Sequence, residues 1–304
     1  MEDVAHAGPA GQQAEVELGD GTFGALVRAL GNGGAVVLSG AGLSTESGIP
    51  DYRGPSGQAR RAQPMTYQAF TGSGQARQRY WARSHLGWRH ITTAAPNAGH
   101  QAVAELRRRG LVSAIITQNV DGLHQAAGAA SVTELHGSLH RVVCLGCWQR
   151  TSRLSLDARL RAANPSWGLP CGPLLPPGHE ETRPEEPAVN PDGDVALDET
   201  DGFTVVDCLD CGGVLKPDVV FFGENVPRAR VDDCCALVSG ASSLIVLGSS
   251  LTVFSGLRYV RHAAKLGIPV MIVNQGATRG DDLAAIRLDA PLGRTLTAAV
   301  AALS

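Results

Sequence analysis

No long hydrophobic run occurs in this 304-residue sequence, and no stretch approaches the roughly 18 uninterrupted apolar residues that a membrane helix needs. Basic residues are missing from its start, where the first arginine or lysine is Arg28 and acidic residues such as Glu2 and Asp3 come before it. A signal peptide opens with positive charge and a transit peptide is rich in arginine, so this start favours neither. We expect a protein that has no membrane partner and is located in the cytoplasm.

Lysine is nearly absent, since Lys216 and Lys265 are the only two among 26 basic residues. The formal net charge is −3 and charged residues make up 18% of the chain. This balance argues against the broad basic surface with which proteins coat nucleic acid or anionic membranes. We predict a globular monomer without a direct nucleic-acid partner, which recognises any basic partner locally.

Cysteine occurs seven times, and its spacing is more typical of a metal site than of a disulfide framework. Two C-x₂-C pairs are formed by Cys144 with Cys147 and by Cys208 with Cys211. Four thiolates are the usual donors of a closed tetrahedral Zn²⁺ site, which leaves no position for water. We predict one structural zinc ion per chain. A redox interpretation is an alternative for one pair alone.

Four short apolar runs predict buried parallel strands, at residues 35–38, 112–117, 244–247 and 270–273. Helix-like segments lie between them, for example residues 100–109 and 256–266, each followed by a glycine. Strands that alternate with helices indicate an α/β fold with a doubly wound, Rossmann-like parallel sheet.

The predicted domain boundaries fall where this alternation breaks. Residues 1–22 have no apolar periodicity and predict a flexible tail. Residues 23–140 and 217–304 are assigned to the Rossmann-like domain, and residues 141–216 to a smaller inserted zinc-binding module. Residues 170–201 of the insertion are rich in proline, glycine and acid and predict a long solvated loop, where Cys171 has no partner at ligand spacing.

A glycine-rich turn follows the first predicted strand, in the order S-G-A-G-L-S-T from Ser39 to Thr45. Its glycines allow the backbone to approach a pyrophosphate at a helix N-terminus. Thr45 replaces the third glycine of G-x-G-x-x-G, so this turn alone is weak evidence for a dinucleotide. Asp51, Tyr52 and Arg53 add a carboxylate, a ring and a guanidinium that can hold a ribose, stack and neutralise phosphate.

From Ser39 to Arg53 the sequence S-G-A-G-L-S-T-E-S-G-I-P-D-Y-R resembles the cofactor loop of the sirtuin family. Further matching blocks are T-Q-N-V-D-G-L-H at 117–124, E-L-H-G-S at 134–138, K-P-D-V-V-F-F-G-E at 216–224 and G-S-S-L-T-V at 248–253. The resemblance covers residues of about 23 to 304. It implies an NAD⁺-dependent protein-lysine deacylase, a deacetylase in the simplest case, with NAD as co-substrate and acylated lysine in proteins as partner.

The catalytic residues implied by the resemblance are His136, Asn119 and Asp121. His136 matches the base of the family, and His124 is its rival, which we interpret as a pocket-orienting residue. Gln118 is expected to contact ribose, Asn119 to orient the nicotinamide ribose and Asp121 to bind the carboxamide. Taken without the resemblance, Asn119 and Asp121 are more typical of a turn or a helix cap than of a binding site.

The resemblance also implies a wider set of NAD contacts. At the position of Leu292 the family often has cysteine, so only a backbone contact is expected from Leu292. The full set is Gly40, Ala41, Gly42, Ser44, Thr45, Asp51, Tyr52, Arg53, Gln118, Asn119, Asp121, Gly248, Ser249, Ser250, Asn274, Gln275, Gly276 and Leu292.

The substrate residues implied by the resemblance hold an extended peptide by strand addition, and they are Val220, Phe221, Gly223, Glu224 and Val253. The blocks R-Q-R-Y-W-A-R at 77–83, N-P-S-W at 164–167 and P-D-G-D-V at 191–195 resemble the class II branch, which includes the lipoamidase and ADP-ribosyltransferase type. Tyr80 and Arg83 are spaced to share a helix face toward the acyl pocket. They suggest an acyl group longer or more acidic than acetyl, and a solvated arginine is the alternative.

The implied reaction begins when the acyl-lysine carbonyl oxygen attacks C1′ of the nicotinamide ribose and nicotinamide leaves. His136 then deprotonates a ribose hydroxyl, and water finally yields lysine and O-acyl-ADP-ribose. Two alternatives are a protein mono-ADP-ribosyltransferase and a noncatalytic NAD-sensing binding module.

Overall fold

The computed structural model describes residues 20–52, 64–167, 193, 195, 197 and 199–304. Arg53, Cys171 and most of the predicted acidic loop lie outside the described residues. A six-stranded sheet has the order β3-β2-β1-β7-β8-β9, and every neighbouring pair in it is parallel. Its strands are β1 (Ala35–Ser39), β2 (Val112–Thr117), β3 (Val132–Glu134), β7 (Ser243–Leu247), β8 (Val270–Val273) and β9 (Ile286–Leu288). The prediction of a Rossmann-like α/β fold is confirmed.

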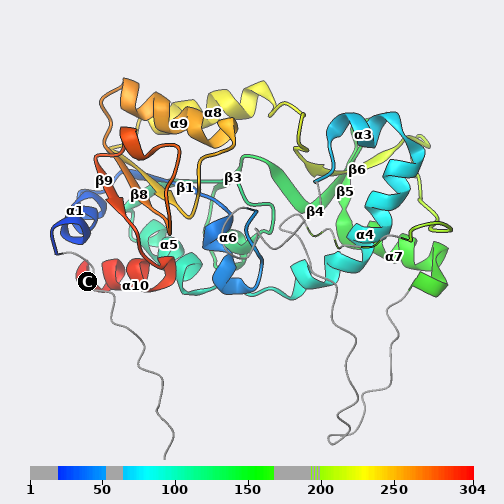
Figure 1. Ribbon diagram of the computed structural model, residues 1–304, viewed down its shortest axis with the longest axis horizontal. Helices are drawn as coiled ribbons and strands as arrows, with labels where there is room; N and C mark the ends of the chain where they lie inside the picture. The colour runs from blue at the N-terminus through cyan, green and yellow to red at the C-terminus, as the bar shows by residue number, and fades with distance from the viewer. Residues whose placement is uncertain (1–19, 53–63, 168–192, 194, 196, 198) are drawn as a thin grey trace, which may run out of the picture.

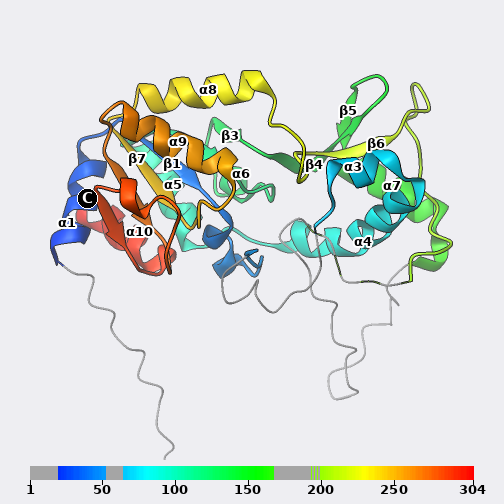
Figure 2. The same cartoon turned by 45° about the horizontal axis from the view of Figure 1, so that its top comes forward.

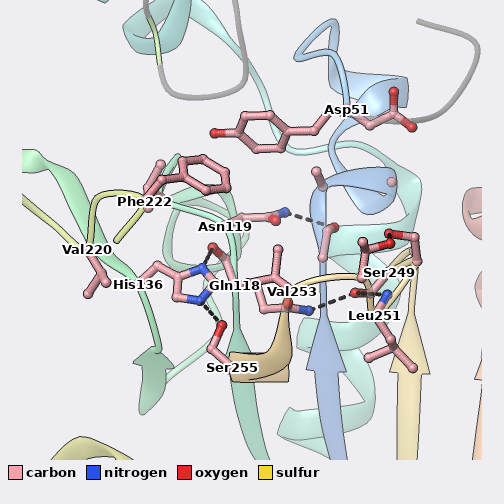
Figure 3. Close-up of a pocket in the computed structure, with 18 of the residues that line it drawn as sticks. Asp51, Gln118, Asn119, His136, Val220, Phe222, Ser249, Leu251, Val253 and Ser255 are labelled. Atoms are coloured by element: carbon pink, nitrogen blue, oxygen red, sulfur yellow. Dashed lines mark hydrogen bonds between the residues drawn. The ribbon is translucent and has the colours of Figure 1, made fainter. Parts of the chain in front are cut away.

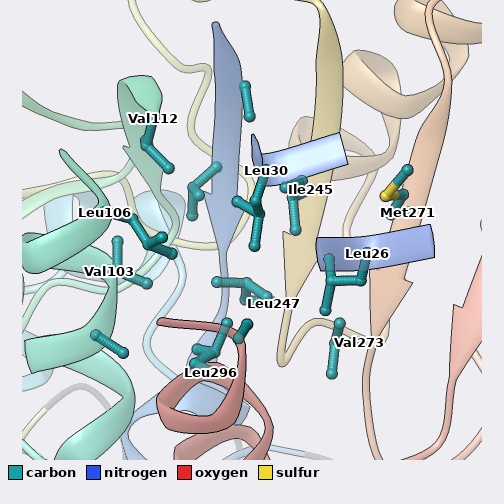
Figure 4. Close-up of a cluster of buried hydrophobic side chains, with 14 of the residues drawn as sticks. Leu26, Leu30, Val103, Leu106, Val112, Ile245, Leu247, Met271, Val273 and Leu296 are labelled. Carbon is teal, nitrogen blue, oxygen red and sulfur yellow. The ribbon is translucent and has the colours of Figure 1, made fainter. Parts of the chain in front are cut away.

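Helices cover both faces of this sheet, because side chains of a strand alternate between its two sides. Val37 and Ile245 pack with α1 (Asp20–Gly31), α5 (Ala98–Arg108) and α10 (Leu292–Ala302) in one core, shown in Figure 4. Val36 and Leu244 face the other way, toward α8 (Arg228–Ser239) and α9 (Phe254–Lys265). Figure 1 shows these two helix layers above and below the sheet.

A second sheet has three antiparallel strands in the order β5-β4-β6, formed by β5 (Arg150–Ser152), β4 (Gly137–Cys144) and β6 (Leu215–Val219). Around it lie α3 (Tyr67–Gly72), α4 (Gly74–Thr93) and α7 (Arg153–Ala163) (Figures 1 and 2). Their buried side chains form a separate core that includes Trp81, Leu156 and Phe203. The molecule therefore has two lobes, and α3 and α4 join the smaller one although they precede the insertion in sequence.

The four strands predicted from apolar runs are all present, and the helices expected at 100–109 and 256–266 correspond to α5 and α9. Asn97 fixes the start of α5, since its side chain accepts from the backbone N–H groups of Gly99 and His100. The helix α1 begins at Asp20, so residues 20–22 are helical although the sequence suggested a tail up to residue 22. Within the described residues no helix is long and apolar enough to cross a membrane.

Candidate active site

A cavity of about 800 Å³ lies at the carboxyl ends of β1, β2, β7 and β8, and the chain after β6 closes its other side. Open parallel sheets bind ligands at this edge. Most of the site residues that were predicted from the sequence line this cavity. They are Gly40, Ala41, Gly42, Ser44, Asp51, Tyr52, Gln118, Asn119, Asp121, His136, Val220, Phe221, Gly223, Glu224, Gly248, Ser249, Ser250, Val253, Asn274, Gln275 and Gly276.

Close backbone packing explains the glycines of the loop after β1. The Gly42 N–H donates to the Gly248 carbonyl at 2.8 Å, and a Cβ on Gly42 would lie 2.9 Å from that same oxygen. A Cβ on Gly40 would lie 2.7 Å from Cβ of Ser249. The two turns after β1 and β7 therefore pack backbone to backbone, which leaves open space above them for a ligand.

Ser44, Asn119 and Asp121 form one hydrogen-bonded cluster at the floor of the cavity. The Ser44 hydroxyl donates to Oδ2 of Asp121 at 2.7 Å, and Nδ2 of Asn119 donates to Oγ of Ser44 at 3.0 Å. The other carboxylate oxygen of Asp121 accepts from the Leu123 N–H at 2.9 Å, at the start of the short helix α6 (Leu123–Ala126). Asp121 therefore stabilises the turn before α6, which agrees with its alternative interpretation as a turn or helix-cap residue. It also lines the cavity.

Gln118 links the two strand ends on either side of β1. Its side-chain Nε2 donates to Oγ of Ser249 at 2.9 Å, and its backbone carbonyl oxygen lies 2.9 Å from Nδ1 of His136 (Figure 3). A carbonyl oxygen only accepts, so Nδ1 of His136 carries the proton and Nε2 of the neutral ring is an acceptor.

His136 follows the short strand β3 and faces the cavity between Gln118 and Ser255 (Figure 3). Burial lowers the pKa of its imidazole, and the positive charge of Arg230 lowers it further, while the bond to the Gln118 carbonyl opposes both. The ring is therefore neutral near pH 7 and can accept a proton at Nε2. Oγ of Ser255 lies 2.8 Å from this atom, and no sequence motif predicted Ser255 as a site residue.

Two further histidines, His100 and His124, are buried and do not line the cavity. Burial lowers the pKa of His124 to about 3, and the neighbouring His100 lowers it as well. Burial also lowers the pKa of His100 to about 4, against the opposing charge of Asp121. Nε2 of His124 lies 2.8 Å from Oγ of Ser39, the last residue of β1. His124 therefore packs below the strand ends and does not line the cavity, whereas His136 does.

The chain after β6 forms the opposite wall and is held by an ion pair between a buried lysine and a partly buried glutamate. The Lys216 amine lies 3.0 Å from Oε2 of Glu224, and this oxygen also accepts from the Phe221 N–H at 2.8 Å. Burial lowers the pKa of Lys216, and the charge of Glu224 opposes that shift. The Tyr67 N–H donates to the Phe222 carbonyl at 2.9 Å, which pairs this segment with the start of α3.

Four nominated residues do not line the cavity. Thr45 donates to the Gly42 carbonyl within the loop, and Leu292 is buried at the start of α10. Tyr80 is 1% exposed, and its ring packs 5.3 Å from that of Phe221, behind the cavity wall. The Arg83 guanidinium donates to the Leu197 carbonyl at 2.9 and 2.7 Å.

The four predicted metal ligands meet at one end of the smaller lobe. All four Sγ atoms lie within 4.8 Å of one another, with 3.4 Å between Cys144 and Cys211 and 3.8 Å between Cys147 and Cys208. A tetrahedral zinc ion with Zn–S bonds of about 2.3 Å requires sulfur separations near 3.8 Å. The residues fit a structural Zn²⁺ ion.

This combination defines a class of protein: a Rossmann-like nucleotide-binding fold with a four-cysteine insertion and a partly buried, neutral histidine that lines its cavity. Residues 40–255 match the model of the Sir2 family. The chain belongs to this family, whose members are called sirtuins.

Curated relatives cover most of the chain. It is 60% identical over 271 residues to the NAD-dependent protein deacetylase 1 of Streptomyces coelicolor, covering 88% of this chain and 86% of that protein. It is 51% identical over 265 residues to the NAD-dependent protein deacetylase 1 of Mycobacterium avium, covering 87% and 89%.

Solved structures agree with this fold. A structure of Sir2 with a p53 peptide and NAD⁺ has a TM-score of 0.70 at 28% identity, and covers 91% of this chain and 97% of that chain. A structure of Sir2Tm bound to a propionylated peptide has a TM-score of 0.68 at 27% identity, and covers 93% and 99%.

Proposed function

We propose that this chain removes acyl groups from lysine side chains of proteins and consumes NAD⁺, releasing nicotinamide and O-acyl-ADP-ribose. It is an NAD-dependent protein deacetylase of the sirtuin family, like its curated relatives. One observation carries the proposal for the site: a partly buried histidine, neutral and with Nε2 as acceptor, lines the cavity that the glycine loop also lines.

Each wall of the cavity has a separate proposed task. The packed turns at Gly42 and Gly248 bind the dinucleotide backbone, since both glycines line the cavity and add no side chain that would block its approach. Asn119 and Asp121, tied together through Ser44, bind the nicotinamide ribose and the carboxamide. Asn274 lies at the end of β8, where an adenosine ribose is expected.

The peptide binds between the chain after β6 and the turn at Val253. Val220 and Val253 both line the cavity, and both are labelled near His136 in Figure 3. Backbone hydrogen bonds hold an extended peptide there, so side-chain selectivity is loose. Relatives solved with acetylated or propionylated peptides support this substrate class.

The proposed reaction starts with attack of the acyl oxygen on C1′ of the nicotinamide ribose, and nicotinamide leaves. Nε2 of His136 accepts the proton of a ribose hydroxyl, whose oxygen attacks the alkylamidate carbon. Water then releases lysine and O-acyl-ADP-ribose. The cavity positions both reactants and keeps bulk water away from the cationic sugar.

Mass spectrometry of products from NAD⁺ and an acetyl-lysine peptide tests this function. We expect His136→Ala to lower turnover at least about 100-fold because the base is lost. His262→Ala is the matched control, since that histidine binds Ser239 on α8 away from the cavity, and it should keep full turnover. A protein adduct in place of O-acyl-ADP-ribose would support ADP-ribosyl transfer instead. Without nicotinamide release, only a binding module is left.

We also propose that the chain is a cytoplasmic monomer of the class II branch, with residues 141–216 as its zinc module. Four of the six described cysteines form the metal cluster, and such use of cysteine is typical of a reducing compartment. An acyl group longer than acetyl is proposed from the sequence blocks, with Tyr80 packing behind Phe221, whereas Arg83 donates to the Leu197 carbonyl outside the cavity and gives no support to a preference for acidic acyl groups. A panel of acyl peptides in which acetyl-lysine turns over fastest would overturn the proposed preference for a longer acyl group.

A further inference from the structure

Ser255 is the one described side chain that hydrogen-bonds to Nε2 of His136, with 2.8 Å between Oγ and Nε2. It is the second residue of α9, and this helix begins without a side-chain cap, so the hydroxyl is not used to cap the helix start. Ser255 and His136 both line the cavity, and Figure 3 shows the Ser255 side chain directly below the His136 ring. This contact brings together residues 119 positions apart.

The direction of this hydrogen bond follows from the other side of the ring. The Gln118 carbonyl can only accept, so it fixes the proton on Nδ1 and leaves the lone pair on Nε2. The Ser255 hydroxyl must therefore donate to Nε2. The same lone pair has to take the ribose proton in the proposed reaction, so the hydroxyl and the ribose compete for one atom.

We propose that Ser255 is a positioning residue for the base: its hydroxyl holds the His136 ring with Nε2 toward the cavity, and the ribose hydroxyl of NAD⁺ displaces it. This inference rests on the proposed function. In the free enzyme Ser255 occupies the reactive atom, and in the complex with NAD⁺ it does not.

The charged groups near His136 cannot explain a change in its pKa when only the Ser255 hydroxyl is removed, because these groups stay in place. Arg230 reaches it from α8, where its guanidinium donates to the Leu135 carbonyl at 3.1 Å, and it is equally present with or without the Ser255 hydroxyl. Arg258 of α9 and Asp121 after β2 line the same cavity and also stay in place. A change on removing the hydroxyl alone therefore reports the hydrogen bond.

The test compares Ser255→Ala with the parent in two measurements, an NMR titration of the His136 ring and pH profiles of deacylation. A donor to the neutral ring favours the neutral form, so its loss raises the pKa of His136 in the free enzyme. We expect the acid limb of kcat/KM to move to higher pH, with values roughly three- to ten-fold lower on that limb. The acid limb of kcat stays unchanged because the complex no longer uses the hydroxyl.

Two further variants complete the experiment. Ser255→Thr keeps a hydroxyl and should restore the parent profile. Ser239→Ala removes an equivalent serine–histidine contact, 2.8 Å from His262 and outside the cavity, and should leave both limbs unchanged. Saturating NAD⁺ should bring the His136 titrations of Ser255→Ala and the parent together.

An unchanged His136 titration in Ser255→Ala would overturn the positioning role. Equal shifts of the kcat and kcat/KM limbs would overturn the displacement, because the hydroxyl would then remain bound in the complex. If the titration moves as expected while the parent enzyme releases no deacylated peptide, the hydrogen bond is correct and the proposed function fails.

Discussion

At the level of single residues, the spacing between backbones decides which positions of the site tolerate a side chain. Gly40, Gly42 and Gly248 pack against one another where the turns after β1 and β7 meet. The sequence pointed to the first two through a motif, although that motif lacks its third glycine. Ser255 had no such signal, because a serine in the first turn of a helix looks like any exposed polar residue until the fold brings it to His136.

Gly42→Ala is expected to weaken both the fold and NAD⁺ binding. The added Cβ would lie 2.9 Å from the Gly248 carbonyl oxygen, which forces one turn to move and lowers the free energy of unfolding by about 1–3 kcal/mol. Gly21→Ala is the control, since nothing lies within 4 Å of a Cβ at that position of α1. It should raise the unfolding free energy by about 0.5–1 kcal/mol. Urea denaturation and calorimetry with NAD⁺ measure both effects, and equal losses in the two variants would contradict the packing argument.

At the level of elements, burial explains which strands could be predicted. The strands β1, β7 and β8 are buried along their whole length, so they read as continuous apolar runs. The smaller sheet gives no such pattern, since β5 has three exposed residues and β4 contains His140 and Arg141. Its position depends on long-range contacts with α4 and on the four cysteines, of which only the cysteines have a spacing that can be read from sequence.

Loss of the metal is expected to destabilise the smaller lobe. Cys144 and Cys208 belong to its buried core, and Cys211 completes the donor set, so Cys211→Ala should lower the zinc content well below about one ion per chain and lower the Tm. Cys235→Ala on α8 removes a thiol outside the cluster and should retain the metal. Elemental analysis and thermal unfolding of the two proteins provide the comparison. Full zinc content in Cys211→Ala would show that the four thiols do not act together.

At the level of the whole molecule, buried neutral histidines couple stability to pH. The pKa of His124 is lowered to about 3 and that of His100 to about 4, both mainly by burial, whereas the unfolded chain titrates near 6.5. As the pH falls below 6.5, the unfolded state binds protons first. Stability is therefore complete above that pH and is lost progressively toward pH 3–4.

His124→Gln should make the unfolding free energy less dependent on pH. One histidine of this kind accounts for about 2 kcal/mol of stability lost between about pH 7.5 and about pH 5. His262→Gln, on the exposed end of α9, should keep the parent dependence. Urea denaturation at the two pH values checks this, and an unaltered slope in His124→Gln would mean that the buried ring is not what titrates.

The burial of Lys216 limits the number of lysine side chains on this enzyme that can themselves be acylated. One of the two lysines in the sequence is 3% exposed and engaged with Glu224, so Lys265 on α9 is the lysine whose amine solvent reaches. Acyl donors that react with lysine amines therefore have one accessible lysine side chain to modify. A deacylase with so few lysines of its own offers few acylated side chains that could compete with its substrates, and amine-directed dyes have one accessible lysine side chain to label, on α9.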